Sequence, residues 1–580
     1  WVQHVRARSF MMNKLKSLLS WIKSGSPWIW LTGGAVSISM LSVLGLMLLI
    51  GWKGLTYFWP APLYQWQVDS KDLSLVVDLD ETVSKQDVLI GQLYERKYIP
   101  IEQVPQAHDL LSPQNLSTGL IQRLSIKVAN RELYPADFVS ILDVNLREPT
   151  TPSEWAVIER SRGGYFFGKP VGFKTASGSY QTNIDQKLED GLAFADTLRE
   201  ETSRVVNQEI RNISWQLENL RLEKRKLELN ESVNDEYLKT YTQTKLKLNS
   251  QLDEAEVKLE HLRTQLNVES LLVEDMTGER VEIPLSHILD YWYPNKMSYP
   301  EKVGHWGKQV WKFLSENPRD SNSEGGVFPA IFGTVLLVIL MSIVVMPLGV
   351  VAAIYLHEYA KNNALTRLIR IAVINLAGVP SIVYGVFGLG FFVYTIGGSI
   401  DSLFYAERLP APTFGTPGLL WSALTLAVLT LPVVIVTTEE GLTRIPSSVR
   451  HGSLALGATQ FETLWRIVLP MASPAIITGL ILAIARAAGE VAPLMLVGVV
   501  KLASSLPVDG QFPYLHLERK FMHLGFHIYD VGFQTSNIEA ARPLVYATSF
   551  LLVTVIVGLN LTAINIRNNL REKYRTLGQD

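Results

Sequence analysis

Cysteine is absent from this sequence of 580 residues. This absence excludes disulfide bonds, zinc sites built from thiolates and a cysteine nucleophile. The sequence also lacks the pattern Gly-x-x-x-x-Gly-Lys-Ser/Thr, so the chain is not expected to cradle the phosphates of ATP by that loop. The formal net charge is only −2, and the lack of an overall basic field excludes nucleic acid as the main partner.

Paired catalytic groups and metal-ligand spacings are missing as well. No nucleophile has a base at a characteristic spacing, so we predict no catalytic residue, no cofactor and no metal site. Three histidines, His516, His523 and His527, are spread over one segment between apolar runs. We interpret them as surface or packing residues rather than ligands. The sequence therefore gives no reason to expect an enzyme.

Charged residues are scarce for a chain of this length. They make up 19% of the sequence, against 47% hydrophobic residues, and the mean hydropathy is +0.15. An ordinary soluble enzyme of this size is less apolar. The average combines two different parts, because residues 61–325 are rich in charge whereas long apolar runs occupy residues 28–52 and the chain from 328 onward. One part is predicted to lie in water and the other in lipid.

The first apolar run, Trp28 to Ile50, contains no charge and is long enough to cross a hydrocarbon core of about 30 Å. It exceeds the signal-peptide core of roughly 7 to 15 residues, so we interpret residues 28–52 as a transmembrane helix rather than a cleaved signal. Met11-Met12 offers an alternative start of the chain. By the positive-inside rule, residues 1–27 are expected in the cytoplasm. They carry basic and no acidic side chains: Arg6, Arg8, Lys14, Lys16 and Lys23.

Residues 61–325 are then predicted to form an exported mixed α/β domain. Short apolar patches alternate with turn residues between about 61 and 180, which predicts strands. From about 203 to 268, apolar residues recur at steps of three and four, and the polar segment 230–235 interrupts them. We expect an antiparallel coiled-coil hairpin, with a single long helix that pairs with another chain as the alternative.

The part of the chain from 328 to 575 is predicted to be an all-α membrane domain with five further spans. Its apolar runs are 328–356, 371–396, 418–438, 475–499 and 544–566. Six crossings in total place two loops, 357–370 and 439–474, and the C-terminus in the cytoplasm. The basic residues agree with this topology: Lys361, Arg367 and Arg370, then Arg444, Arg450 and Arg466, then Arg567, Arg571, Lys573 and Arg575.

The loop 439–474 is partly apolar although it is expected outside the membrane. A short helix that ends at Gly457 and a second that begins after Thr459 would expose apolar side chains: Leu454, Leu456, Phe461 and Trp465. These side chains are predicted either to dock on a cytoplasmic partner or to pack on the chain's own transmembrane bundle. The residues alone favour neither interpretation.

A charged pair stands inside the run 475–499. Arg486 lies about halfway along it, where a charge costs at least about 2.5 to 3.5 kcal/mol, so it is expected to face protein or water. Glu490 follows four positions later on the same helix face. The pair is either structural or part of a path for a tetrahedral oxyanion, whose oxygens suit the two parallel donors of a guanidinium. Four residues interrupt the run 371–396, as in helices that line a pathway or pack closely: Pro380, Gly385, Gly388 and Gly390.

Three stretches resemble one family of membrane proteins. Gly457, followed by Ile467 and then Leu469-Pro470, resembles the EAA loop of ABC importer permeases, which docks in a groove of the ATPase subunit. The family's opening Glu-Ala-Ala is replaced here by His451-Gly452-Ser453, so a docking contact from that glutamate is not carried over. Residues 379–385 and 485–494 resemble phosphate-specific transport (Pst) permeases, and the Gly-Glu-x-Ala-Pro form of the second stretch is similar to the A-type (PstA-like) subunit. The likeness covers about 328–575.

This resemblance implies a type I ABC importer permease in a bacterial inner membrane that carries phosphate. It implies three kinds of partner: a second homologous permease subunit (PstC-like), an ATPase dimer (PstB-like) and an extracytoplasmic phosphate-binding protein (PstS-like). Arg486 and Glu490 would line the substrate pathway. The residues expected to couple to the ATPase are Arg450, Leu454, Leu456, Gly457, Phe461, Trp465, Ile467, Leu469 and Pro470. The alternatives are a permease for another oxyanion and a membrane sensor, which would need a larger cytoplasmic tail than the one after Ile566.

Overall fold

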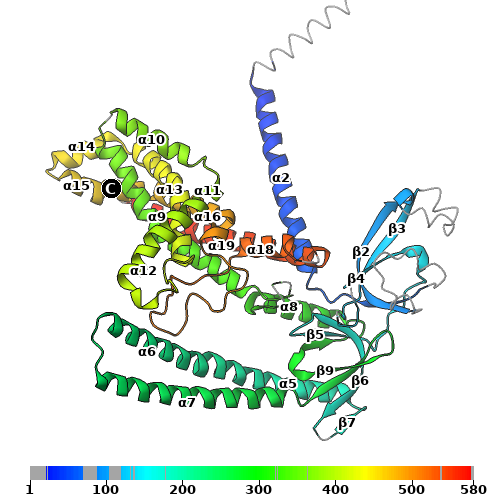
Figure 1. The fold of residues 1–580 in the computed structure, drawn as a ribbon. Coiled ribbons are helices and arrows are strands. Elements are labelled where there is room, and N and C mark those ends of the chain that lie inside the picture. Colours follow the sequence, from blue (N-terminus) through cyan, green and yellow to red (C-terminus); the bar gives the residue numbers. More distant parts are fainter. Residues whose placement is uncertain are drawn as a thin grey trace, which may run out of the picture.

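The chain folds into a helical membrane domain and a mixed α/β domain (Figure 1). Helix α2 (Ser26–Thr56) precedes the first strand of the α/β domain, and helix α8 (Tyr299–Ser315) follows its strand β10 (Ile288–Trp292). This computed structural model describes residues 21, 24–68, 88–103, 119–130, 132–134, 137–176, 178–319, 322, 324–361, 363–535 and 538–576. The predicted basic segment at 1–27 lies almost entirely outside the described residues, as does the apolar patch at 73–77.

Six helices in the described part are long and apolar enough to cross a membrane, as predicted. Three of the spans lie within single long helices: α2 (Ser26–Thr56), α13 (Leu419–Thr443) and α19 (Ile538–Thr576). Two others contain α9 (Phe328–Ile354) and α16 (Leu469–Gly489), and each also includes a π-helical segment, after α9 and before α16 respectively. The remaining span, Ser381–Phe404, combines α11 (Ser381–Phe387), the π-helical segment Gly388–Gly397 and α12 (Gly398–Phe404). The fold class is therefore a membrane all-α domain with an additional α/β domain after the first span.

Helix α13 lies at the centre of the membrane domain, between α9 and α16. Small residues let the backbones approach one another: a Cβ on Gly349 of α9 would lie 2.6 Å from a Val434 side-chain carbon, and one on Gly479 of α16 would lie 2.1 Å from the Thr437 hydroxyl. Substitutions at either glycine would therefore push these helices apart. Close contacts of this kind hold helices together in lipid, where no hydrophobic force acts between them.

The predicted span 371–396 is wrong at its beginning. The chain forms a separate helix α10 (Ala364–Leu376), turns at residues 377–380, and starts the span only at Ser381. Pro380 lacks a backbone N–H and precedes the first residue of α11, so it ends the earlier helix and fits at the start of the later one. Because α10 also carries apolar side chains, the end of α10 and the start of α11 had been predicted as one apolar run.

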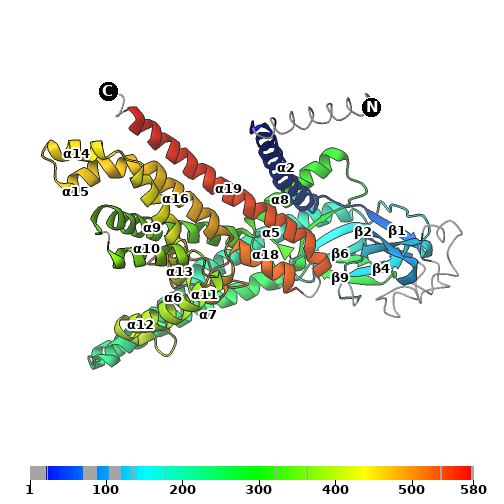
Figure 2. The same ribbon diagram turned by 90° about the horizontal axis from the view of Figure 1, so that it is seen from above.

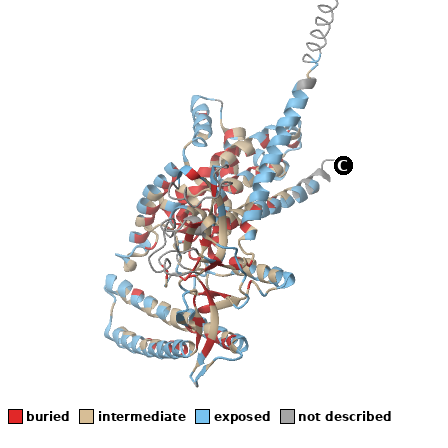
Figure 3. Cartoon of the chain, turned by 90° about the vertical axis from the view of Figure 1, so that its right-hand side faces the viewer, coloured by how far each residue is buried: buried red, intermediate tan, exposed pale blue. Residues whose placement is uncertain are grey.

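Helix α2 stands beside α19 and touches little else in the membrane domain (Figure 2). The contact depends on glycine, because a Cβ on Gly54 would lie 2.8 Å from the Cα of Ala547. The rest of the α2 surface is exposed along its length (Figure 3). In a membrane these apolar side chains would face lipid or another protein chain.

The α/β domain contains strands, as predicted, and most of them form two antiparallel sheets. The first has the order β1-β2-β3-β4: β1 (Leu63–Gln67), β2 (Val88–Pro100), β3 (Leu120–Lys127) and β4 (Phe138–Leu142). The second has the order β10-β5-β6-β8-β9, with β7 paired to β6. Its strands are β5 (Ala156–Arg160), β6 (Tyr165–Thr175), β7 (Gly178–Tyr180), β8 (Ser270–Glu274), β9 (Arg280–Pro284) and β10 (Ile288–Trp292).

The predicted helical hairpin is present between β7 and β8. Its first arm runs through α5 (Ile184–Arg204), a π-helical turn and α6 (Arg211–Leu229), and its second arm is α7 (Asp235–Leu266). The arm begins at Ile184 rather than near 203, so the predicted range was too short. Four apolar residues of the expected seam on α7 are buried: Leu248, Ala255, Leu259 and Leu262. That the arms form a regular coiled coil stays a prediction.

The hairpin lies against one end of the membrane domain (Figure 1). Helix α6 contacts residues 406–408, and the side-chain amide of Gln511 donates a hydrogen bond of 3.3 Å to the carbonyl of Arg211. Helices α14 (Ser447–Ala455) and α15 (Gln460–Thr463) lie at the opposite end of the membrane domain. The hairpin and the loop 439–474 are therefore on opposite sides, as the predicted topology requires.

Candidate functional site

The loop that carries α14 and α15 breaks where the sequence predicted. Helix α14 ends at Ala455, Gly457 has a φ of 90°, and α15 begins after Thr459. Thr459 caps α15 in a reciprocal arrangement, because its hydroxyl accepts from the Glu462 backbone N–H while the Glu462 carboxylate accepts from the Thr459 backbone N–H. Glycine supplies the left-handed backbone that reverses the chain between these two helices.

The outer surface of this loop is apolar and exposed. Leu456 is 90% exposed, Phe461 67% and Trp465 64%, and Leu454 is exposed as well. The rings of Phe461 and Trp465 stack with centroids 6.3 Å apart. These side chains do not pack on the chain's own bundle. Exposed apolar side chains gathered on one loop are of the kind that another protein covers.

The inner surface holds the loop to the membrane helices. Ser453 on α14 and Thr463 on α15 are both buried, and their hydroxyls are 2.8 Å apart, which fixes the two short helices to each other. Ile467, Leu469 and Pro470 are partly buried, and Leu469 packs against a core cluster at the base of the loop. These three residues support the exposed patch rather than belonging to it.

Arg450 also points inward. Its guanidinium lies 3.0 Å from a Glu358 carboxylate oxygen, just beyond α9, and donates to the carbonyl of Leu442 on α13 at 2.8 Å. A similar link joins α10 to α13, since Arg370 lies 2.9 Å from the Glu439 carboxylate. Glu358, Arg370 and Glu439 had not been predicted as site residues. Their partners are distant in sequence, so no local pattern could have revealed them.

Arg486 lies in the last turn of a helix and not in the middle of a span. Helix α16 ends at Gly489, and the short helix α17 (Ala492–Val497) follows after Glu490 and Val491. The prediction of one continuous span over 475–499 is therefore wrong. Pro493 in the first turn of α17 and the extended backbone of Glu490 mark the interruption. The Arg486 side chain thus lies beside a break between two helices.

The Arg486 and Glu490 side chains form a loose ion pair, with Nε and Oε1 3.5 Å apart. Their side chains are 32% and 19% exposed. Within the described part of the chain, no further hydrogen bond to the guanidinium occurs, so its other N–H groups remain available. A guanidinium in this state can still donate two parallel hydrogen bonds to an anion.

A second interrupted segment meets this one. The Tyr384 hydroxyl on α11 donates to the Leu376 carbonyl at the end of α10, at 2.6 Å, and so bridges the interruption around Pro380. Helix α11 packs against α17. Gly385 allows the contact, because a Cβ there would lie 2.7 Å from the Cα of Pro493. Tyr384 was part of the segment 379–385 but had not been predicted as a site residue.

The three histidines are packing residues, which was one of the two expected roles. All are buried, and His516 lies between the Asp509 and Glu518 carboxylates at 3.0 and 3.1 Å. His523 precedes α18 (Leu524–Phe533), and its Nδ1 accepts from the backbone N–H of Gly525. Neither ring nitrogen of His527 has a partner within the described residues.

Acid is expected to destabilise the segment around α18, which lies outside the six spans. Burial lowers the pKa of His523 and of His527 to about 4. For His527, Asp530 partly opposes this shift and Lys501 adds to it. The unfolded chain therefore takes up protons first, so stability is full above about pH 6.5 and falls as the pH drops towards 4. Each histidine can contribute up to roughly 3 kcal/mol.

Thermal unfolding of the purified chain between pH 7 and 4 tests this expectation. His527→Phe should flatten the acid dependence, because the buried ring then cannot be protonated. The matched control is His451→Gln, since His451 is exposed. An unchanged acid dependence in His527→Phe would contradict the assignment.

Comparison with known proteins connects these features to a family. The family model for the inner membrane component of binding-protein-dependent transport systems matches residues 345–571, which include the loop and the two interrupted segments. Probable ABC transporter permease protein YqgH of Bacillus subtilis is 34% identical over 34% of this chain and 60% of its own length. Phosphate transport system permease protein PstA 1 of Mycobacterium tuberculosis is 33% identical over 42% of this chain and 71% of its own length.

The chain belongs to this family of ABC importer permeases. Among solved structures, the inward-facing MetNI methionine ABC transporter is 18% identical, with a TM-score of 0.31 over 47% of this chain and 99% of that one. Permeases of this family work with a further permease, a separate ATPase subunit and a periplasmic binding protein. The permease here is a multi-pass membrane subunit of such an importer.

Proposed function

We propose that the permease is the A-type subunit of an ATP-driven phosphate importer in a bacterial inner membrane. Several relatives named as PstA phosphate transport permeases support the substrate class. The observation that carries the proposal is the guanidinium of Arg486, which lies where two interrupted membrane segments meet and keeps donors free. Helix interruptions of this kind commonly line the substrate path of transporters.

The chemistry of the site suits a hydrated oxyanion that must pass rather than stay. Two N–H groups of Arg486 would hold two phosphate oxygens, and Glu490 would orient the guanidinium from 3.5 Å away. The negative charge of Glu490 would also weaken anion binding, which favours release. Tyr384 would keep the interrupted α10–α11 segment next to this position through its 2.6 Å hydrogen bond to Leu376.

The exposed loop supports an ATPase partner, and membership of the family supports the other two partners. The exposed side chains Leu454, Leu456, Phe461 and Trp465 would enter a groove of the ATPase (PstB-like) dimer, with Gly457 fixing the turn and Arg450 holding the loop to α9. A homologous permease (PstC-like) would complete the pathway, and a phosphate-binding protein (PstS-like) would deliver the substrate from outside. The basic loops and tail would face the cytoplasm together with both termini.

Uptake by the assembled complex in membrane vesicles tests the substrate. With ATP inside and the binding protein outside, labelled phosphate should accumulate, and excess unlabelled sulfate should compete far less than unlabelled phosphate. Accumulation of sulfate or of a phosphonate in preference to phosphate would assign the permease to another oxyanion. A complex that assembles and hydrolyses ATP yet accumulates none of these anions would contradict the proposal.

The outer part of the helical hairpin is expected to be separable from transport. Val205 of the first arm and Ala255 of the second are buried in one cluster, so a short linker replacing residues 207–253 should preserve the base of the hairpin. The six spans should still insert. Uptake should fall by no more than a few-fold, through weaker delivery by the binding protein rather than through the membrane path.

A shorter deletion, of residues 219–245, provides the matched control because it retains Arg211 and its hydrogen bond with Gln511. The binding protein's affinity and the uptake rate should be measured in both variants. If the longer deletion binds the binding protein normally but moves no phosphate, the hairpin belongs to the translocation machinery.

A further inference from the structure

Helix α9 continues into a π-helical segment, Tyr355–Tyr359, at its end nearest the loop that carries α14 and α15. Turns of this kind are rare and occur frequently at functional sites. Two arginines from different parts of the chain, Arg450 and Arg370, contact this segment. Each of them also binds α13, so both arginines link the same two elements.

Arg450 links the π-helical segment to the loop. Its Nη2 lies 3.0 Å from a Glu358 carboxylate oxygen and donates at 2.8 Å to the carbonyl of Leu442 on α13. The same carboxylate oxygen lies 3.0 Å from Nδ1 of His357. The Arg450 and Glu358 side chains are 20% and 13% exposed, and a charged pair that is largely shielded from water is costly to separate. The loop and the end of α9 are therefore expected to move together.

Arg370 makes a matching link from α10. Its Nη2 donates at 2.8 Å to the carbonyl of Leu356, in the π-helical segment, and lies 2.9 Å from the Glu439 carboxylate on α13. A cavity of about 290 Å³ lies beside these contacts, between α10 and α13, so the apolar packing there is incomplete. The two polar contacts of Arg370 therefore contribute much of what holds this part of α10 in place.

The other end of α10 reaches the proposed substrate path. The carbonyl of Leu376 accepts the 2.6 Å hydrogen bond from the Tyr384 hydroxyl on α11. Helix α11 packs against α17 at Gly385, where a Cβ would lie 2.7 Å from the Cα of Pro493, and α17 follows the break at Glu490. A series of contacts thus runs from α14 through the π-helical segment and α10 to α11.

We propose that Glu358 and Arg370 are positioning residues that couple the ATPase-docking loop to the substrate path. A movement of the loop pulls the π-helical segment through Arg450 and Glu358, and the segment moves α10 through Arg370. Helix α10 in turn shifts α11 against α17. The inference rests on the proposed function, because it gives a docked ATPase a route to the path at Arg486.

Cysteine labelling in the assembled importer tests this route, because the permease chain contains no cysteine of its own. Ser381→Cys places a nearly isosteric, partly exposed thiol at the start of α11. Its rate of labelling by a water-soluble maleimide is measured with and without ATP and vanadate. Nucleotide should change this rate by at least about threefold, and Glu358→Gln or Arg370→Gln should abolish the change. Arg370→Lys should retain it, since one nitrogen makes both contacts of Arg370.

Arg367→Gln and Glu440→Gln are the matched controls for the two variants. Arg367 lies on α10 with Arg370, and Glu440 follows Glu439 on α13. Both side chains are exposed, and neither forms an ion pair with another described residue. Both controls should keep the nucleotide response at Ser381→Cys.

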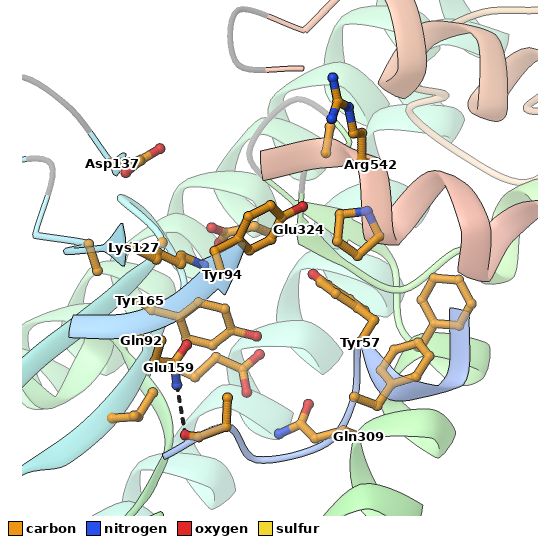
Figure 4. Close-up of a pocket in the computed structure, with 18 of the residues that line it drawn as sticks. Tyr57, Gln92, Tyr94, Lys127, Asp137, Glu159, Tyr165, Gln309, Glu324 and Arg542 are labelled. Atoms are coloured by element: carbon orange, nitrogen blue, oxygen red, sulfur yellow. Dashed lines mark hydrogen bonds between the residues drawn. The ribbon is translucent and has the colours of Figure 1, made fainter. Parts of the chain in front are cut away.

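A control reporter lies at the outer end of the molecule, in a cavity of about 820 Å³ between the α/β domain and helices α2 and α19 (Figure 4). On the α/β side of this cavity, the Gln92 side chain donates to the Ala61 carbonyl at 3.1 Å, and the Lys127 ammonium lies over the Tyr165 ring at 4.6 Å. Because these contacts lie within the α/β domain, Gln92→Cys should label at the same rate with and without nucleotide. An equal nucleotide response at Gln92→Cys and Ser381→Cys would indicate a rearrangement of the whole permease and would overturn the local route.

The amount of phosphate moved per ATP hydrolysed measures the consequence for transport. Glu358→Gln and Arg370→Gln should still assemble with the ATPase and lower this ratio about tenfold. A merely structural role would reduce the amount of complex and leave the ratio unchanged, and that result would overturn the proposal. So would a Ser381→Cys permease that does not respond to nucleotide, or a normal response in both variants. If the importer carries another anion, the proposed function fails, but the labelling response does not depend on the anion and still decides the coupling route.

Discussion

Phosphate uptake should persist weakly in Arg486→Lys and fall by about a hundredfold or more in Arg486→Gln. Lysine keeps the charge but loses the planar pair of donors, so the remaining transport should also discriminate less well against sulfate. Glutamine removes the charge and leaves Glu490, which is 19% exposed and 3.5 Å away, without its partner. The measurement is uptake normalised to the amount of assembled complex in the membrane.

The double variant Arg486→Gln with Glu490→Gln separates transport from stability. If the ion pair is only structural, neutralising both side chains leaves no unmatched charge, and assembly and transport should return together. If the guanidinium contacts the anion, assembly returns and transport does not. Arg444→Gln is the matched control, because Arg444 is exposed just after the end of α13. Full transport by the double variant would disprove the anion role.

Gly457→Val should abolish transport while the permease still inserts into the membrane. At a φ of 90°, a β-branched side chain clashes with its own backbone, so the turn between α14 and α15 cannot keep its shape. A Cβ at this position would meet no atom within 4 Å, so the effect comes from the backbone alone. Phosphate-dependent ATPase activity and co-purification of the ATPase subunit measure the loss of coupling.

Two further variants show whether backbone conformation is the cause. Gly452→Val adds the same side chain on the preceding helix, where the position is also open but φ is not positive, and it should retain most transport. Gly457→Asn should be intermediate, because asparagine tolerates the left-handed region better than valine. Normal ATPase association and uptake in Gly457→Val would remove this loop from the coupling mechanism.

The sequence was sufficient to predict the loop because its determinants are local. Gly457 and the capping residues Thr459 and Glu462 lie within six positions. The apolar residues around them, such as Phe461, are too few to form a membrane span of their own. The inward direction of Arg450 could not be predicted in the same way. Its partner Glu358 belongs to another part of the chain, so the contact exists only after α9 and α14 have come together.

The interruptions in the membrane helices were harder to place from composition. The residues after Glu490 are as apolar as those before it, so a hydropathy argument joins α16 and α17 into one span. Pro493 was the available signal, since proline is favoured in the first turn of a new helix. The approach of the two interrupted segments depends on how α11 packs against α17, and no spacing within either segment encodes that contact.

The return of the chain to its sheet after the hairpin was also missed. Strands β8, β9 and β10 follow α7, and β8 pairs with β6, which precedes the hairpin. Short apolar segments such as Ser270–Glu274 have only a weak strand pattern. Because a long helical stretch precedes them, the strand-rich part was predicted to end before the hairpin. The hairpin therefore begins after β7 and ends before β8, and both strands pair with β6 in the same sheet.

The helical hairpin is attached at two places, to the sheet at its base and to Gln511 of the membrane domain at Arg211. At 1.5 Å per residue, roughly 40 Å separates Ile184 from Arg211, and roughly 27 Å of helix extends from there to Leu229. Any shift of the segment around Gln511 relative to the sheet would tilt the hairpin about its base. The tip of the hairpin would then move about 1.7 times as far as Arg211 does. A spectroscopic label placed near Asn230, at the tip, would therefore detect small rearrangements at the end of the membrane domain that the hairpin contacts.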